Sequence, residues 1–324
     1  MTIGTIGAIA FETDRRLQPV GLGRMARWMV GGKVNTLRPP AQVAVTRCTS
    51  YDDDLQVCIR DLWDSATMPD VRGKRVLIKP NLVDFDSERP VATHPAIVAA
   101  VIDVVQALGV SELVVGDGSA FHREAAPLLQ VSGLAQVLSD RNVRFVDLNY
   151  DDPKPMPANK LWFLDQRNLW IARHALEADI IISLPKLKTH HWAGVSLSMK
   201  NLFGVAPGCC YGWPKNMLHH NGIPLSINGI YAALPQVVAI VDGITGMEGD
   251  GPLFGKSVSH GVLIAGTDPL AVDITGSQLM GYNLEEIPHL WLAQTAGVGQ
   301  SEKIEVVGPP ITDLVHSYEK PPSL

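Results

Sequence analysis

Short apolar runs rich in β-branched residues recur along most of this chain and alternate with segments of helical periodicity. Such a run fits a buried strand, because a strand covered on both faces needs apolar side chains on both. The runs predict strands at 43–48, 75–79, 112–116, 143–148, 168–172, 179–183, 236–242, 262–265 and 303–307. Strands that alternate with helices predict an α/β fold with mostly parallel sheets and helices on both faces.

Helical periodicity fills the segments between these runs. It predicts helices at 52–65, 95–108, 124–139, 268–280 and 285–296. Pro95 suits a first helical turn, and Gly109 suits the residue after a helix end. Asp268 is a good N-cap residue directly before Pro269.

The length of 324 residues allows one large domain or two medium ones. A segment rich in proline and aspartate at 151–159 indicates an exposed loop, which favours two lobes with a cleft between them. We expect an α/β lobe at 41–155 and a second α/β lobe with active-site loops at 156–310. Residues 1–40 would form an N-terminal extension or lid, and 311–324 a C-terminal tail.

The composition is that of an ordinary globular protein, with 46% hydrophobic and 19% charged residues. A net charge of −6 argues against a nucleic-acid partner, which selects a basic surface. No apolar run reaches the roughly 18 residues that a transmembrane helix needs. We therefore expect a cytoplasmic protein without a transmembrane segment, and a homo-oligomer is compatible with these features.

Cations gather in the segment 184–208, directly after the expected strand 179–183. This segment holds three lysines and two histidines but no carboxylate. In open parallel sheets, ligands bind beyond the carboxyl ends of the strands. The segment therefore predicts a site for a small anionic molecule, whereas a basic surface edge with a satisfied histidine is the alternative interpretation.

Side-chain periodicity predicts how this segment presents its polar groups. In an extended chain, Lys186, Lys188 and His190 project to one side, because strand side chains alternate. A helix starting near residue 194 would place Ser196 and Lys200 on one face. One concave surface could then receive both sets.

Other strand ends supply further candidates. His122 follows a Gly-Asp-Gly turn, and a pair of histidines on either side of a substrate could act as base and acid. We expect His122 and His190 to move protons, and Lys200 to stabilise charge, act as a covalent amine or tether a cofactor. The expected ligands of a carboxylate or phosphate are Lys79, Asn81, Arg123, Lys186, Lys188, Ser196 and Asn201.

Whether a metal binds is left open by the sequence. The cysteines form no CxxC pair, so neither a zinc ribbon nor a ferredoxin-type cluster is indicated. The acidic glycine-rich segment after strand 236–242 does not fit the calcium-loop spacing. The candidate ligands for a divalent metal are Asp242, Glu248, Asp250, His219, His220, Cys209 and Cys210.

Several motifs in order resemble those of an uncharacterised family called domain of unknown function 362. They lie at 79–81, 116–118, 186–190, 200–204, 242–252 and 266–273, and the resemblance covers roughly residues 70–300. Members of that family often carry a ferredoxin-type iron–sulfur module. This chain lacks the cysteine quartet, so the resemblance does not imply that cofactor here.

The segment from His190 to Lys200 is also similar to the active site of the nickel-pincer lactate racemases. That resemblance implies an acid/base role for His190, a cofactor tether at Lys200 and a second catalytic histidine at His122. Residues 197–199 (Leu-Ser-Met) are bulkier than the glycine-rich run of the racemases. His219 or His220 is a loose counterpart of their nickel-binding histidine.

These features together predict an enzyme that acts on a small or medium anionic substrate, a carboxylate or a phosphate. Two-histidine acid/base chemistry next to a carboxylate would make it isomerase-, racemase- or lyase-like. The alternatives are a redox or metal-cofactor protein, iron–sulfur-associated or nickel-type, and a non-catalytic binding protein for an anionic metabolite.

Overall fold

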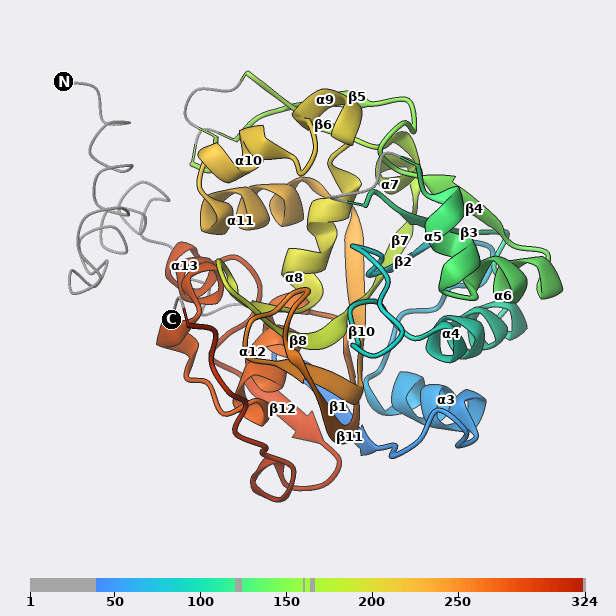
Figure 1. Cartoon of the computed structure of the whole chain (residues 1–324), viewed down its shortest axis with the longest axis vertical. Coiled ribbons are helices and arrows are strands. Elements are labelled where there is room, and N and C mark those ends of the chain that lie inside the picture. The colour runs from blue at the N-terminus through green and yellow to red at the C-terminus, as the bar shows by residue number, and fades with distance from the viewer. Residues whose placement is uncertain (1–38, 120–123, 160, 164–166, 323–324) are drawn as a thin grey trace.

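The computed structural model describes residues 39–322, except 120–123, 160 and 164–166 (Figure 1). Most of the expected N-terminal extension or lid lies outside the described residues. So do His122 and Arg123, two of the expected site residues.

A ten-stranded sheet forms the centre of the molecule, with the order β12-β1-β11-β10-β7-β2-β3-β4 and with β8 paired to both β10 and β9. Along this path only β11 runs antiparallel to its neighbours, which confirms the expectation of a mostly parallel sheet. The strands are β1 (Ala41–Arg47), β2 (Arg75–Pro80), β3 (Glu112–Asp117), β4 (Arg144–Asp147), β7 (Ile180–Leu184), β8 (Lys186–His190), β9 (Gly194–Ser196), β10 (Gln236–Glu248), β11 (Lys256–Gly266) and β12 (Ile304–Val307). A separate antiparallel pair joins β5 (Lys154–Pro157) and β6 (Asn168–Ile171).

Strand β7 shows why an unbroken apolar run marks the middle of this sheet. It lies between β10 and β2, and all of its residues are buried. Ile181 belongs to the apolar core on one face, and Ile182 to the core on the other. A strand covered on both faces therefore has no position for a polar side chain that faces solvent.

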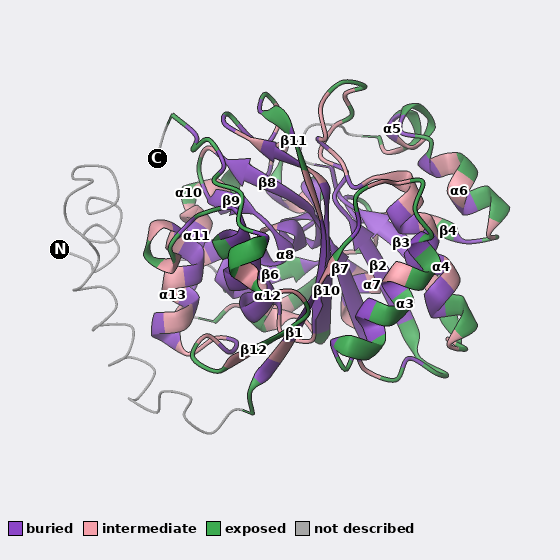
Figure 2. Ribbon diagram, turned by 90° about the horizontal axis from the view of Figure 1, so that it is seen from below, coloured by how far each residue is buried: buried purple, intermediate pink, exposed green. Residues whose placement is uncertain are grey.

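Helices cover both faces of the sheet, as the sequence predicts (Figure 2). One face packs against α3 (Leu55–Ser65), α4 (Pro95–Ala107), α5 (Ala126–Val131) and α6 (Leu134–Asp140). The other packs against α8 (Ser198–Asn201), α11 (Ile223–Ala233), α12 (Pro269–Leu279) and α13 (Pro288–Ala296). Three short helices, α7 (Arg173–Glu177), α9 (Gly208–Tyr211) and α10 (Asn216–His220), lie in the connections. No helix of the described chain is long and apolar enough to cross a bilayer.

Two expected helices differ from the structure. The single helix expected at 124–139 is divided into α5 and α6, because Gly133 between them has φ +77°. The predicted start of the other helix, near residue 194, is wrong. Gly194 has φ +81° and turns the chain back, so that β9 pairs antiparallel with β8, and the helix begins only at Ser198.

The two expected lobes share one sheet. Strands β1 to β4 come from 41–155, and β7 to β12 come from 156–310, so the boundary near residue 155 falls between strands of the same layer. The expected C-terminal tail packs against the end of α12, where Tyr318 N–H donates to Met280 O over 3.0 Å.

The strand order reverses between β2 and β7. After β2 the chain adds β3 and β4 on one side, and β7 then joins β2 on its other side. Such a switch point leaves a crevice at the carboxyl ends of the two strands, which is where ligands bind in open α/β sheets.

Candidate functional site

A cavity of about 140 Å³ opens at this switch point, beyond the ends of β2 and β3 and beside β8. Four lysines line it, Lys79, Lys188, Lys200 and Lys215, whereas Asp117 is the one carboxylate among its described lining residues. His190, His191 and His219 also face it. The cavity therefore combines a large excess of potential positive charge with three imidazole rings.

Lys79 is neutralised by a carboxylate from the neighbouring strand. Its Nζ lies 2.6 Å from Asp117 Oδ1 and 3.1 Å from Asn201 Oδ1, and both charged side chains are buried. Asp117 also accepts the backbone N–H of Leu82 over 2.8 Å and of Gly118 over 2.7 Å. Burial lowers the pKa of Lys79, which the charge of Asp117 opposes.

Glycines let the chain close tightly around this ion pair. A Cβ at Gly204 would lie 2.1 Å from Asp117 Oδ1 and 2.6 Å from Lys79 Cε. A Cβ at Gly118 would lie 2.5 Å from the carbonyl oxygen of Gly204. Only glycine fits at such close approaches, which gives a physical reason for both glycine motifs.

Lys188 enters the cavity from β8, and no carboxylate of the described residues pairs with it. Its Nζ donates to the carbonyl oxygens of Val91 over 2.6 Å and of Pro252 over 3.4 Å. Complete burial and the nearby charges of Lys200 and Lys186 lower the pKa of Lys188 to about 7. The dipoles of these two carbonyl groups therefore hold the amine in place.

Lys215 is a site residue that the sequence did not single out. It lies between α9 and α10 with φ +67°, and its buried Nζ donates to the carbonyl oxygens of Gly118 over 3.0 Å and Phe203 over 3.2 Å. Burial lowers the pKa of Lys215 to about 7. The length and polarity of the loop at 209–224 were the signal that could have directed attention to it.

Lys200 on α8 is the least constrained of the four amines. Its side chain is half-buried, and its Nζ lies 4.4 Å from the centre of the Phe203 ring. Among the described residues it has no hydrogen bond or ion pair. Burial and the charge of Lys79 lower the pKa of Lys200 to about 8.

The neutral rings of His190 and His219 differ at Nε2, which is a hydrogen-bond donor in His190 and an acceptor in His219. His190 Nδ1 accepts the backbone N–H of Trp192 over 3.1 Å and of Ala193 over 3.3 Å, so its proton is assigned to Nε2. His219 Nδ1–H donates to the carbonyl oxygen of Lys215 over 3.0 Å, which leaves Nε2 as an acceptor. Burial keeps the pKa of His190 well below its usual value and lowers that of His219 to about 4.

The other expected ligands of the anion divide into two groups. Asn81, Ser196 and Asn201 line the cavity. Lys186 does not, because its Nζ turns to Asp242 Oδ2 at 2.8 Å and also donates to the hydroxyl of Tyr51.

The candidate metal ligands are scattered. Asp242 is paired with Lys186, whereas Asp250 and His220 are exposed. The Sγ atoms of Cys209 and Cys210 lie 4.0 Å apart. Glu248 accepts the backbone N–H of Glu319. Within the ranges that the structure describes, no three His, Cys, Asp or Glu side chains come together as a metal site would require.

Of the residues that the racemase resemblance implies, His190, Lys200 and His219 line the same cavity. The bulky residues Leu197 and Met199 are buried in the apolar core and do not line the cavity.

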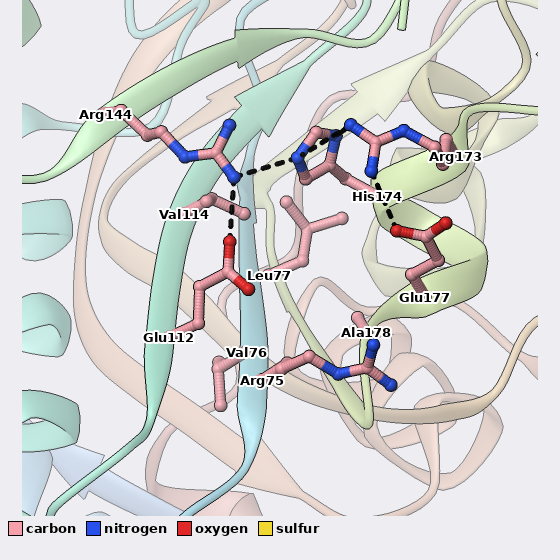
Figure 3. Close-up of a pocket in the computed structure, with 10 residues that line it drawn as sticks. All are labelled: Arg75, Val76, Leu77, Glu112, Val114, Arg144, Arg173, His174, Glu177 and Ala178. Carbon is pink, nitrogen blue, oxygen red and sulfur yellow. Dashed lines mark hydrogen bonds and ion pairs between the residues drawn. The ribbon is translucent and has the colours of Figure 1, made fainter. Parts of the chain in front are cut away.

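A second pocket, of about 110 Å³, lies at the opposite ends of β2 and β3 (Figure 3). Its arginines are already matched by carboxylates: Arg144 pairs with Glu112 and Arg173 with Glu177, each at 2.8 Å. Because its positive charges are balanced, this pocket offers an anion much less than the lysine cavity does.

Comparison with known proteins adds a relative and a distant structural likeness. A thylakoid-associated protein of Synechocystis sp. is 28% identical over 232 residues, which cover 70% of this chain and 69% of the relative. A crystal structure of a Thermotoga maritima protein matches with a TM-score of 0.41 and 14% identity. That match covers 63% of this chain but only 53% of the other, so the chain spans about half of that protein's length.

The order of motifs between 79 and 273 predicts a family, and the comparison bears this out. The family model described as "Domain of unknown function (DUF362)" matches residues 76–278, which include β2, β3, β7 to β11 and all four cavity lysines. Since the match spans more than half of the sequence, this chain belongs to the DUF362 family.

Proposed function

We propose that the protein binds a small carboxylate or phosphate in the lysine cavity and catalyses proton transfer on it, as an isomerase, racemase or lyase does. The observation that carries the proposal is the set of three lysines, Lys188, Lys200 and Lys215, that line the cavity without a carboxylate partner among the described residues.

An ammonium group removed from water without a counter-charge is costly. The protein has two ways to avoid that cost: the lysines lose their protons, or an anion binds between them. The lowered pKa values of Lys188 and Lys215 show the tendency toward the first. A bound anion favours the charged form of both amines, so binding is coupled to proton uptake.

The two neutral histidines fit proton abstraction next to a carbonyl or carboxylate. His219 Nε2 has a lone pair and serves as the base. His190 Nε2–H donates a hydrogen bond to the oxygen on which negative charge develops. A bound anion offsets the charge of Lys200, which is one cause of the low pKa of His219, and so makes His219 a stronger base. The role expected of His122 stays a prediction.

Sulfate and acetate are suitable probes of the binding half of this proposal. Isothermal titration at pH 7 should show binding to the wild type and a loss of affinity of at least about tenfold in Lys188→Met, as expected for one charge-assisted hydrogen bond. Lys256→Met is the matched control, because Lys256 is exposed and pairs with Glu319. No binding of either anion would refute the proposal.

Exchange of a substrate's carbon-bound hydrogen for deuterium tests the catalytic half of the proposal. Small 2-oxo and 2-hydroxy acids incubated with the protein in D₂O should exchange a carbon-bound hydrogen, which NMR detects. His219→Gln should abolish the exchange while anion binding persists. If anions bind but no acid exchanges, the protein is a binding protein for an anionic metabolite instead of an enzyme.

We also propose that the protein acts in the cytoplasm. The name of the Synechocystis relative associates that protein with thylakoids. Fractionation of cells that produce this chain would separate a cytoplasmic location from attachment to a membrane surface.

A further inference from the structure

We propose that Lys200 is a catalytic amine that forms an imine with the carbonyl carbon of a 2-oxo acid held in the cavity. This inference rests on the proposed function, since Lys188 and Lys215 are the lysines left to hold the carboxylate. It narrows the substrate class from any small anion to acids with a carbonyl group beside the carboxylate.

The first reason is the bonding of the amines. Lys79 is held by Asp117, Lys188 by the carbonyl of Val91, and Lys215 by the carbonyl of Gly118. An amine that donates to fixed acceptors cannot turn its lone pair toward an electrophile without breaking those bonds. Lys200 has no such acceptor among the described residues and rests on the face of Phe203, so its Nζ is free to turn into the cavity.

The second reason is the position of Lys200 among the other charges. It contributes to the lowered pKa of both Lys188 and Lys215, so its Nζ is within electrostatic range of both amines. In a 2-oxo acid the carbonyl carbon is bonded directly to the carboxylate carbon. An acid bound in the cavity that Lys188, Lys200 and Lys215 all line therefore has its carbonyl group in the same cavity as the amine of Lys200.

The third reason is the protonation state that the step needs. The nucleophile is the neutral amine. With a pKa of about 8, roughly half of Lys200 is neutral at pH 8, against under about 1% of an unperturbed lysine. The half-buried position and the neighbouring Lys79 thus favour the reactive form without a dedicated base.

The step balances without an oxidant or a metal. The amine nitrogen bonds to the carbonyl carbon, and the carbon–oxygen double bond opens to give a carbinolamine. The oxygen then leaves as water and takes both protons of the amine, one of which His219 Nε2 can relay. The product is the imine of Lys200 and the acid, whose carbon–nitrogen bond withdraws electrons from the neighbouring carbon and so assists the proposed proton abstraction.

Reductive trapping tests the inference. The full chain is incubated with pyruvate or glyoxylate at pH 8, treated with sodium borohydride, and measured by intact-mass and peptide mass spectrometry. We expect one covalent adduct, located on Lys200, whose rate of formation rises from pH 6 to 8. Lys200→Arg should reduce the adduct at least about tenfold while sulfate affinity stays within about threefold, because the positive charge is retained.

The controls separate this inference from the proposed function. Lys256→Arg, a change at an exposed ion pair, should be labelled like the wild type. If the wild type binds sulfate but gives no adduct with either acid, or if the adduct forms equally in Lys200→Arg, the role of Lys200 is overturned and the anion site stands. If the wild type binds no anion at all, the proposed function itself is refuted, and the inference on Lys200 with it.

Discussion

Lys186 and Lys188 leave the same side of strand β8, two residues apart, and both are buried. The Nζ of Lys186 lies 2.8 Å from Asp242, in a closed network with the hydroxyl of Tyr51. The Nζ of Lys188 faces the cavity, and its hydrogen-bond acceptors among the described residues are carbonyl oxygens. One strand thus holds a neutralised lysine beside one that is not neutralised.

Burial of a lysine therefore does not by itself indicate its role. The pair of Lys186 and Asp242 joins β8 to β10, and Asp242 also accepts the backbone N–H of His94 over 3.0 Å. That pair is internally satisfied and needs no ligand. Lys188 lacks this compensation, so its environment improves when an anion arrives.

The largest effect expected from this comparison concerns the closed pair. Asp242→Asn leaves the ammonium of Lys186 buried without a counter-charge, and should lower the free energy of unfolding by about 3–5 kcal/mol. Urea denaturation measures it. The double variant Asp242→Asn/Lys186→Met should recover much of the loss, because the unpaired charge is removed as well. A loss below about 1 kcal/mol would mean that the pair is not what stabilises this region.

Lys188→Met should behave in the opposite way. The apo protein should keep its stability within about 1 kcal/mol or gain some, because an uncompensated amine is replaced by an apolar chain of similar length. Sulfate affinity should fall about 10- to 100-fold, the range for a charge-assisted hydrogen bond of about 1.5–3 kcal/mol. If stability fell instead while affinity held, Lys188 would be a structural cation like Lys186.

The stability of the apo protein should also depend on pH through Lys188. The folded-state pKa of Lys188 is about 7, below its unfolded value near 10.5, so the unfolded chain binds more protons between these two values. The stability of the apo protein should therefore rise with pH from 7 to 10, by at most about 1.4 kcal/mol per pH unit for each such lysine. Thermal unfolding at pH 7, 8 and 9 measures the slope, which should be smaller in Lys188→Met.

Added sulfate gives the control for this slope. A bound anion raises the pKa of the cavity lysines toward the unfolded value, so saturating sulfate should stabilise the protein most near pH 7 and least near pH 9. An equal stabilisation at both pH values would show that the anion binds away from Lys188, Lys200 and Lys215.

The central strands were predictable because they are covered on both faces. The runs for β2, β3 and β7 differ from the structure by at most one residue at either end, since an unbroken apolar run suits only such a strand. Strand β10 was expected to end at 242 but continues to Glu248. Residues 243–248 (Gly-Ile-Thr-Gly-Met-Glu) alternate apolar side chains with glycine and polar ones, so no unbroken apolar run marks their pairing with β11.

The cavity was predictable only in part. Lys79, Lys188, His190 and Lys200 follow from the rule that ligands bind at the carboxyl ends of parallel strands. The partners of the lysines were not predictable, because Asp117 meets Lys79 only once β3 lies beside β2. Lys215 itself has φ +67° in the loop that brings it to the cavity. A lysine in the sequence gives no sign of this left-handed backbone conformation.

The smallest expected effect tests whether the network around Lys186 and the anion site at Lys188 are independent of each other. Tyr51→Phe removes a hydroxyl that donates to Asp242 Oδ1 over 3.0 Å and accepts both the backbone N–H of Thr245 over 3.2 Å and a hydrogen bond from Lys186 Nζ. The ion pair of Lys186 and Asp242 remains, and so does the stacking of the ring on His94. We therefore expect a loss of about 0.5–1.5 kcal/mol in urea denaturation, that of an ordinary hydrogen bond, with unchanged sulfate affinity. A matching loss of affinity would show that the closed network helps to position Lys188.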